Sequence, residues 1–158
     1  MDMYSNNLIC DILIYINNNI LDKITIESLE KRFFYNRYYI MKLFKQEIGL
    51  TLIEYINSIR IYNSIMQLKN NNYSLTNIAF RNGFYSLEYF SETFKHITNA
   101  NPRLFKYYFH NQNKLSLEQI NKINTTIIRL YDVVNIKDKY LSKRKTNNYH
   151  VKKLSIFK

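Results

Sequence analysis

The sequence contains few of the residues that usually interrupt helices: two glycines and one proline in 158 residues. Because tight hairpin turns depend on glycine and proline, this scarcity favours a mostly helical fold. The single cysteine, Cys10, excludes a disulfide within the chain and a cysteine-rich metal site. No stretch approaches the roughly 18 consecutive apolar residues of a membrane-spanning helix, and the residues after Met1 lack the pattern of a signal peptide. We therefore expect an all-α cytoplasmic protein with no membrane partner.

Patterns typical of catalysis are missing as well. His96, His110 and His150 are scattered without metal-ligand spacing. The sequence has no glycine-rich phosphate-binding loop and no paired carboxylates in a catalytic arrangement. Cys10 lies near the apolar face of a helix expected over residues 7–18, which predicts a buried thiol. We therefore expect no enzymatic activity, no metal and no cofactor.

Apolar residues and positive charge are plentiful. Hydrophobic residues make up 46% of the chain and include 15 tyrosines and 10 phenylalanines, which is enough for a real core. The 23 lysines and arginines exceed the 12 aspartates and glutamates, giving a net charge of +11. This excess points to a polyanionic partner, either nucleic acid or an acidic membrane surface. The abundance of Asn, Ile, Lys and Tyr is also typical of an AT-rich genome, which explains part of the lysine excess.

Residues 36–49 carry the most informative pattern. Read as a helix, this stretch has an apolar side and an opposite side with three positive charges. A shorter helix expected over residues 26–34 precedes it, and a tight turn separates the two. This arrangement is typical of a helix-turn-helix that reads the DNA major groove; an ordinary amphipathic helix with solvated charges is the alternative. The apolar side contains Tyr39, Ile40, Leu43 and Phe44, and the basic side contains Arg37, Tyr38, Met41, Lys42 and Lys45.

An internal repeat favours the helix-turn-helix. Residues 74–106 repeat the pattern of residues 25–56, and a long helix expected over residues 53–68 connects the two copies. Two copies on a rigid connector would present two reading helices to one face of DNA, about 34 Å apart. The matched pairs are Ile26/Leu75, Leu29/Ile78, Phe33/Asn82, Tyr39/Tyr89, Ile40/Phe90, Leu43/Thr93, Phe44/Phe94, Lys45/Lys95 and Tyr55/Phe105.

An ordered series of residues runs through both copies, and the second copy carries it most clearly. These residues are Ile78-Ala79, Gly83-Phe84, Tyr89-Phe90-Ser91, Phe94-Lys95, Pro102 and Phe105-Lys106, together with Leu29, Tyr39, Leu43-Phe44-Lys45, Glu47, Gly49, Tyr55 and Arg60. With this series, the chain resembles the AraC/XylS family of bacterial transcription regulators over about residues 8–108, and in particular its stand-alone, MarA-like members.

The resemblance implies a seven-helix, two-subdomain DNA-binding domain over residues 1–110. Its helix-turn-helix motifs would cover residues 25–48 and 74–98, joined by a linker helix over residues 52–69. It also implies binding to double-stranded DNA as a monomer in the bacterial nucleoid, with activation of transcription and RNA polymerase as a further partner. Base readout would come from the outward residues of the third and sixth helices.

Four positions depart from the family pattern. Glu30 replaces a small residue, and Phe34 replaces a glycine in the turn, where a left-handed non-glycine residue costs on the order of 1 kcal/mol. We therefore expect this turn to be reshaped. Asn99 replaces the glycine after the sixth helix and tolerates the same conformation. Glu92 stands where a basic residue is common.

The two reading helices differ in charge, so we expect the first to dominate. Its outward face carries +3, from Arg37, Lys42 and Lys45, whereas Glu88, Glu92 and Lys95 give the second −1. Phosphate contacts provide affinity and base contacts provide discrimination. Some of the residues expected to contact phosphates are alternatively ordinary solvated surface charges. The expected base-reading residues are Arg37, Tyr38, Met41, Lys42, Leu87, Glu88, Ser91 and Glu92, and the expected phosphate contacts are Lys45, Arg81, Lys95, Arg103 and Lys106.

Beyond residue 110 the family pattern ends. Residues 111–136 predict one more amphipathic helix, which either packs on the second subdomain or pairs with a partner. Residues 137–158 hold eight lysines and arginines against Asp138, a net charge of +7. This basic tail either adds phosphate attraction, lies on an anionic membrane, or is a disordered end.

Three functions are compatible with the sequence. The first is a sequence-specific transcription regulator. The second is a partner-binding protein derived from a regulator, with weak or nonspecific DNA binding. The third is a nonspecific binder of nucleic acid or anionic membranes, driven by the basic tail.

Overall fold

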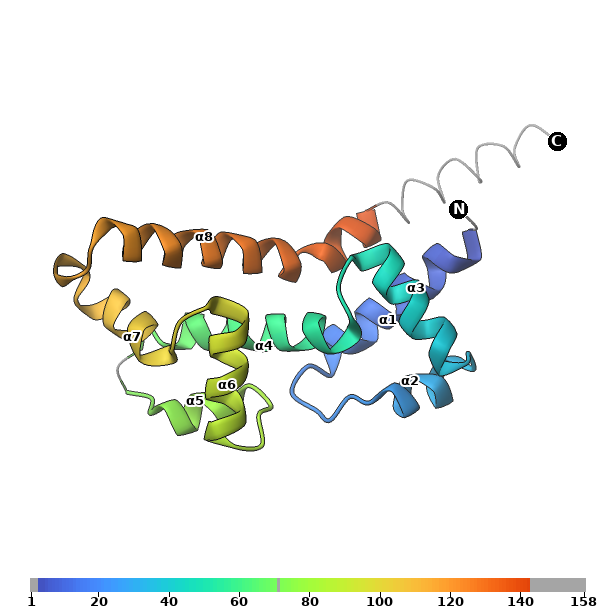
Figure 1. Cartoon of the computed structure of the whole chain (residues 1–158). Helices are drawn as coiled ribbons and strands as arrows, with labels where there is room; N and C mark the ends of the chain where they lie inside the picture. The colour runs from blue at the N-terminus through green and yellow to red at the C-terminus, as the bar shows by residue number, and fades with distance from the viewer. Residues whose placement is uncertain (1–2, 71, 143–158) are drawn as a thin grey trace. The chain divides into compact units, whose positions relative to one another are not determined.

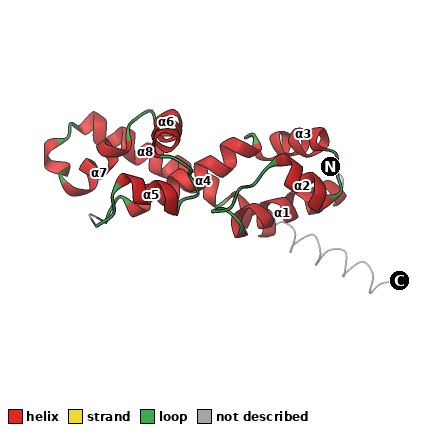
Figure 2. Cartoon of the chain, turned by 90° about the horizontal axis from the view of Figure 1, so that it is seen from below, coloured by secondary structure: helices red, strands yellow, loops and turns green. Residues whose placement is uncertain are grey.

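The computed structural model describes residues 3–70 and 72–142, and this part of the chain is helical with short connections (Figures 1 and 2). The prediction of an all-α fold with two helix-turn-helix motifs and an additional C-terminal helix is confirmed, and the described residues contain no strand. The helices are α1 (Met3–Asn18), α2 (Ile26–Phe33), α3 (Arg37–Ile48), α4 (Leu52–Gln67), α5 (Leu75–Arg81), α6 (Leu87–Thr98), α7 (Pro102–His110), the 3-10 turn η1 (Gln112–Lys114) and α8 (Leu117–Val134).

The chain divides into two compact units. Unit 1 consists of Met1–Asn19, Ile24–Leu52 and Asn135–Lys158, and unit 2 consists of Ile20–Lys23 and Ile53–Val134. Each unit contains one helix-turn-helix: α2 and α3 in unit 1, and α5 and α6 in unit 2. We refer to α3 and α6 as the recognition helices.

In unit 1, α3 packs against both α1 and α2. Most of the predicted apolar side of each helix is buried, and Cys10 is buried with it in α1. Tyr39 is the exception, because it was expected on the apolar side of α3 and is 43% exposed. Thr25 and Ser28 form a reciprocal capping box at the start of α2. Asn36 caps α3 by accepting a hydrogen bond from the amide of Tyr38 at 2.8 Å. The buried residues are Leu8, Ile9, Cys10, Ile12, Leu13, Ile16, Leu29, Ile40, Leu43, Phe44 and Leu52.

In unit 2, a chain of aromatic rings forms the centre of the core. Phe84, Phe90, Phe94 and Phe105 meet edge to face, with centroid separations of 5.2, 5.6 and 5.1 Å. The helix α8 lies along α4, where Tyr131 contacts Tyr62 (Figure 1). Buried residues of α8 complete the core, so the expected C-terminal amphipathic helix packs on the second subdomain. The core comprises Ile61, Ile65, Leu68, Ile78, Ala79, Phe84, Phe90, Phe94, Phe105, Tyr108, Ile123 and Leu130.

The internal repeat is also visible in the backbone. Phe34, the C-cap of α2, and Gly83, the residue after the C-cap of α5, are both left-handed, with φ of 59° and 77°. Gly49 and Asn99, the C-caps of the recognition helices, are also left-handed, with φ of 79° and 55°. The expected reshaping of the turn at Phe34 is therefore wrong: the left-handed conformation persists. Phe34 is 91% exposed, so its side chain meets solvent and not the packed interior.

A C-terminal segment completes unit 1. Residues 136–142 are helical, although a basic tail was expected from residue 137, and residues 143–158 of that tail lie outside the described residues. The phenol of Tyr140 donates to the carbonyl of Glu47, in the last turn of α3, at 2.8 Å. The thiol of Cys10 in turn donates to the carbonyl of Tyr140 at 3.7 Å. Within residues 3–70 and 72–142, no helix combines the length and apolarity that crossing a membrane requires.

Candidate nucleic-acid interface

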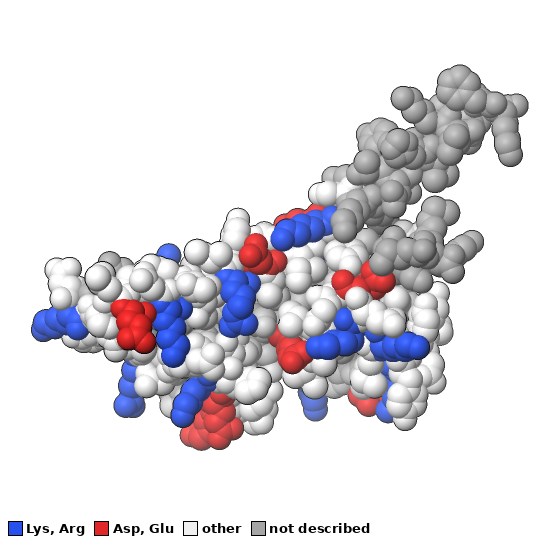
Figure 3. Space-filling model, turned by 45° about the horizontal axis from the view of Figure 1, so that its top comes forward, with Lys and Arg blue, Asp and Glu red and all other residues white. Residues whose placement is uncertain are grey.

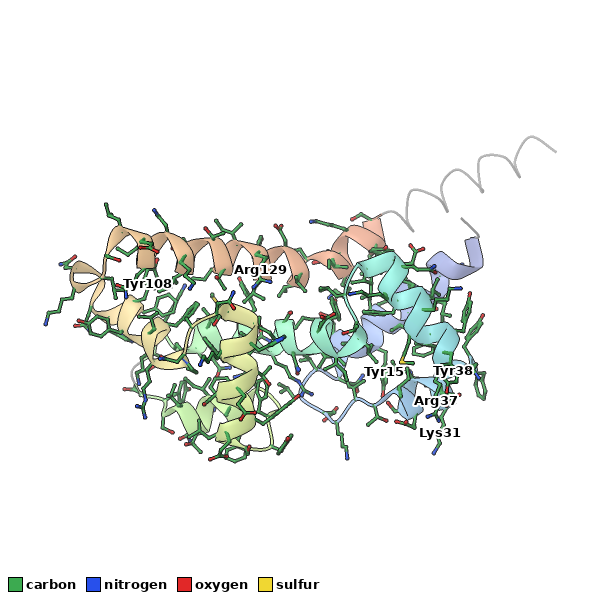
Figure 4. All side chains as sticks on the ribbon, in the orientation of Figure 1. Tyr15, Lys31, Arg37, Tyr38, Tyr108 and Arg129 are labelled. Carbon is green, nitrogen blue, oxygen red and sulfur yellow. The ribbon has the colours of Figure 1, made fainter. Side chains whose placement is uncertain are left out.

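The outer face of α3 presents the residues expected to read bases. Tyr38 is 73% exposed, and Met41, Lys42 and Lys45 are also exposed. Figure 4 shows Arg37 and Tyr38 at the end of α3 that follows the turn from α2. Ile40, Leu43 and Phe44 are buried on the opposite side, which fixes the rotation of the helix. The structure therefore places Tyr38, Met41, Lys42 and Lys45 on an accessible surface.

Arg37, one of the three positive charges expected on this motif, forms ion pairs within unit 1. Its guanidinium contacts Glu27 at 3.4 Å and Glu30 at 3.1 Å, both on α2. Its backbone amide also donates to Glu30 Oε1 at 3.2 Å, which satisfies one of the free amides in the first turn of α3. The two carboxylates offset the positive charge of Arg37, and the sequence reading missed this pairing.

The outer face of α6 is acidic at its start. Glu88 and Glu92 are exposed, while Leu87 and Ser91 are half-buried. Lys95 is exposed in the last turn and lines a cleft of about 740 Å³ that α8 residues, among them Lys122, also line. The five residues thus lie on an outward-facing side of α6, but two carboxylates occupy the part that follows the turn.

Two of the expected phosphate contacts meet at one tyrosine. The guanidinium of Arg81 lies 4.8 Å from the ring centre of Tyr73, and Lys106 Nζ donates to the carbonyl of Tyr73 at 3.2 Å. Arg81 and Arg103 are exposed, whereas Lys106 is half-buried. Figure 3 shows lysines and arginines in separate small groups on the face that it draws, with acidic side chains among them. The positive charge therefore forms local patches.

Arg60, which matches the family pattern but had no predicted role, holds the second motif in place. The guanidinium of Arg60 donates to the carbonyls of Ile20 at 2.9 Å, Asp22 at 2.7 Å and Gly83 at 3.0 Å. Burial lowers the pKa of Arg60 from its ordinary value, and the electrostatic effects of Tyr89 and Asp22 oppose that shift. An added Cβ on Gly83 would lie 2.9 Å from the carbonyl oxygen of Leu21. Arg60 and Gly83 thus fix the turn that leads into α6.

Tyrosines just before the recognition helices are the main surface feature that the sequence reading missed. Tyr35 stacks on Tyr39 with ring centres 5.5 Å apart, and Tyr85 stacks on Tyr89 at 4.8 Å. Tyr35 and Tyr85 are both exposed. Their shared offset of fifty residues, the same as for Tyr39 and Tyr89, was the available signal.

A family model described as a helix-turn-helix domain matches residues 29–107, which is half of the chain. The transcriptional regulator YdiP of Escherichia coli K12 is 34% identical over 104 residues, covering 66% of this chain and 34% of YdiP. The transcriptional activator AarP of Providencia stuartii is 25% identical over 103 residues, covering 65% of this chain and 76% of AarP. The chain thus spans about a third of YdiP.

Solved structures show the same fold. A Listeria innocua protein of unknown function superposes with a TM-score of 0.57 at 27% identity, covering 61% of this chain and 91% of its own. A Chromobacterium violaceum regulator, described as an AraC-type DNA-binding domain-containing protein, gives a TM-score of 0.59 at 21% identity. That superposition covers 70% of this chain and 98% of the regulator.

Proposed function

Because the chain belongs to the AraC-type helix-turn-helix family of transcriptional regulators, we propose that it recognises a specific duplex sequence mainly through α3. In this proposal α3 enters the major groove with its exposed outer face against the base edges. Lys42 donates to guanine acceptors, and Tyr38 and Met41 contact thymine methyl groups. Lys45, near the C-terminal end of α3, binds a phosphate.

The contrast between the outer faces of α3 and α6 carries the proposal. Lys42 and Lys45 are exposed on α3, whereas Glu88 and Glu92 are exposed on α6. A carboxylate near phosphates weakens binding unless it accepts a hydrogen bond from a cytosine amino group. We therefore assign α6 a mainly positional role, with Leu87 and Ser91 contributing fewer base contacts than α3. Arg81, Lys95, Arg103 and Lys106 are the proposed phosphate contacts of unit 2.

Arg37 has a conditional role in this proposal. Its ion pairs with Glu27 and Glu30 involve partly exposed side chains, and such pairs contribute only about 0–1 kcal/mol. A phosphate or guanine can therefore compete for the guanidinium when DNA is bound. Arg37 then adds to affinity less than Lys42, because its release from Glu30 offsets part of the gain.

The proposal extends to how the regulator works. Two helix-turn-helix motifs in one chain support binding as a monomer to an asymmetric site in the bacterial nucleoid. The similarity to AarP, a named activator, supports activation of transcription. An activator that binds DNA as a monomer needs a further contact with RNA polymerase, which we propose as the protein partner.

The decisive experiment is selection of sites from a random duplex pool with the purified full-length chain. The selected duplex and a scrambled control are then compared by fluorescence anisotropy over a salt series. We expect convergence on one site and tighter binding of the selected duplex at every salt concentration. The base pairs that α3 contacts should vary less among the selected sequences than the remaining base pairs of the site.

The acidic surface of α6 favours a second candidate, in which this face docks on another protein and DNA binding is weak. Its expected result differs sharply from that of the first. The selection would not converge, and selected and scrambled duplexes would bind equally, with a steep dependence on salt. That result would overturn the sequence-specific regulator.

A further inference from the structure

An exposed tyrosine precedes each recognition helix. Tyr35 lies one residue before Asn36, the N-cap of α3, and Tyr85 lies one residue before Ser86, the N-cap of α6. The planes of Tyr35 and Tyr39 make an angle of 22°, and those of Tyr85 and Tyr89 make an angle of 15°. The same stacked pair therefore occurs at the same position in both copies of the repeat.

Burial does not explain why both copies keep this outer ring. Tyr85 is 76% exposed and Tyr35 is 41% exposed. The residues before them are not equivalent, because Phe34 is exposed and corresponds to Gly83, whereas Phe84 is an additional, buried residue. The neighbouring residues thus differ between the two units, but the exposed tyrosine is the same in both. This indicates that the tyrosine has a role at the surface.

The stacks also orient the two hydroxyl groups. A ring held against the first turn of its helix loses little further freedom when it binds, so its hydroxyl is pre-organised. Among the described residues, no hydrogen bond occupies the hydroxyl of Tyr35 or Tyr85. Tyr89 differs, because its hydroxyl accepts a hydrogen bond from Asn57 Nδ2 at 3.4 Å. The outer tyrosines therefore each present an available donor.

We infer that Tyr35 and Tyr85 are DNA-backbone contacts, whose hydroxyls donate to phosphates beside the groove that each recognition helix enters. This inference rests on the proposed function and adds a contact to each unit. The residue before an N-cap lies on the turn that leads into the recognition helix, next to the strand that flanks the groove. Tyrosine hydroxyls are common donors to phosphate oxygens, and such contacts fix register without reading sequence.

The contact has a particular value for unit 2. Glu88 and Glu92 reduce the positive charge that α6 offers to DNA. Tyr85 supplies a neutral donor at the start of the same helix, so α6 can be positioned on the backbone without an added cation. A neutral donor releases no counterion, so its loss weakens binding without changing the salt dependence.

The test replaces each hydroxyl while keeping the ring. Tyr35→Phe, Tyr85→Phe and the double variant are compared by anisotropy on the selected and the scrambled duplex over a salt series. Each single variant should lose about threefold to tenfold in affinity on both duplexes, with an unchanged salt slope. Lys45→Ala, in contrast, should lower the salt slope by roughly 1. Tyr131→Phe on α8 is the matched control and should bind as the wild type does.

The outcomes separate this inference from the proposed function. Unchanged affinity of Tyr35→Phe and Tyr85→Phe, with a wild type that still selects a site, would overturn the tyrosine contacts and leave the regulator intact. A loss confined to the selected duplex would also overturn them, because it would indicate base contacts. A wild type that binds neither duplex would overturn both. Thermal unfolding of Tyr35→Phe and Tyr85→Phe should match that of the wild type, which excludes a folding defect as the cause.

Discussion

The carboxylate of Glu30 binds both the backbone amide and the side chain of Arg37. The Glu30 carboxylate accepts from the Arg37 amide at 3.2 Å and from the guanidinium at 3.1 Å. This contact joins the end of α2 to the start of α3 across the turn at Phe34. A residue that departs from the family pattern therefore stabilises the recognition helix and at the same time reduces the charge that α3 offers to DNA.

Replacing Glu30 should affect stability and DNA binding in opposite directions. Glu30→Ala removes the hydrogen bond to the Arg37 amide and should cost about 1 kcal/mol in the free energy of unfolding. It also removes one of the two carboxylates that hold the Arg37 guanidinium and leaves only the longer contact with Glu27. Binding should therefore tighten on selected and scrambled duplexes alike, with a salt slope steeper by up to about 1. Urea unfolding and anisotropy over a salt series measure the two effects.

Glu30→Gln is the matched control, because the amide oxygen can still accept from the Arg37 backbone while the negative charge is lost. It should tighten DNA binding as Glu30→Ala does but retain more of the stability. If both variants bind DNA as the wild type does, Arg37 does not reach DNA even without its pair with Glu30.

The contrast between caps and this ion pair shows what could be predicted from the sequence. Thr25, Ser74, Ser86 and Asn101 each cap the expected helix, because a cap depends on a side chain and an amide two or three residues away. The Glu30–Arg37 pair depends instead on how the turn brings residues seven positions apart together. Helical periodicity does not extend across a turn, so the outward position of Arg37 was predictable and its pairing was not.

The two equivalent left-handed positions should respond oppositely to substitution. Phe34→Gly should stabilise unit 1 by on the order of 1 kcal/mol, because glycine adopts this conformation without strain and the exposed ring contributes little burial. Gly83→Ala should destabilise unit 2 by more than that, because its Cβ would lie 2.9 Å from Leu21 O and 3.1 Å from Arg60 Cζ. Denaturant unfolding of both variants measures the difference.

The control for strain alone is Gly49→Ala. Gly49 is left-handed with φ of 79°, but an added Cβ there would meet no atom within 4 Å. The change that Gly49→Ala causes in the free energy of unfolding should therefore lie between the gain from Phe34→Gly and the larger loss from Gly83→Ala. A Gly83→Ala variant no less stable than Gly49→Ala would contradict a close approach at the second turn.

The contact of Tyr140 with α3 was beyond the reach of the sequence. Residues 136–142 carry a weak apolar pattern and adjoin the lysine-rich end, so the sequence indicated a tail there. The bond from Tyr140 to Glu47 joins residues 93 positions apart. Such a pairing depends on the path of the whole chain, whereas the apolar faces of α3 and α6 follow from local periodicity.

Tyr140 should make stability depend on alkaline pH. Burial, followed by the charge and hydrogen bond of Glu47 and by Cys10, raises its pKa to about 12, above the value near 10 of an unfolded chain. The protonated phenol therefore stabilises the fold fully below about pH 10, and this contribution is lost as pH rises through about 12. Tyr140→Phe should be less stable than wild type by about 1 kcal/mol at neutral pH, and the difference should vanish at high pH.

Urea unfolding of both proteins over this pH range checks the expectation. Tyr38→Phe is the control, because its ring is 73% exposed and its loss of a hydroxyl should leave stability unchanged at every pH. A constant difference between wild type and Tyr140→Phe across the range would show that the phenol proton has no part in the contact.

Lys42 should determine sequence preference as well as affinity. Lys42→Ala should weaken binding of the selected duplex by roughly 1–3 kcal/mol and relax the preference at one base position, because an ammonium group on a guanine edge discriminates among base pairs. A phosphate contact would instead weaken selected and scrambled duplexes equally and lower the salt slope. Lys122→Ala, an exposed lysine on α8, provides a charge-matched control. Repeating the site selection with Lys42→Ala therefore decides whether α3 reads bases through Lys42 or only binds the backbone.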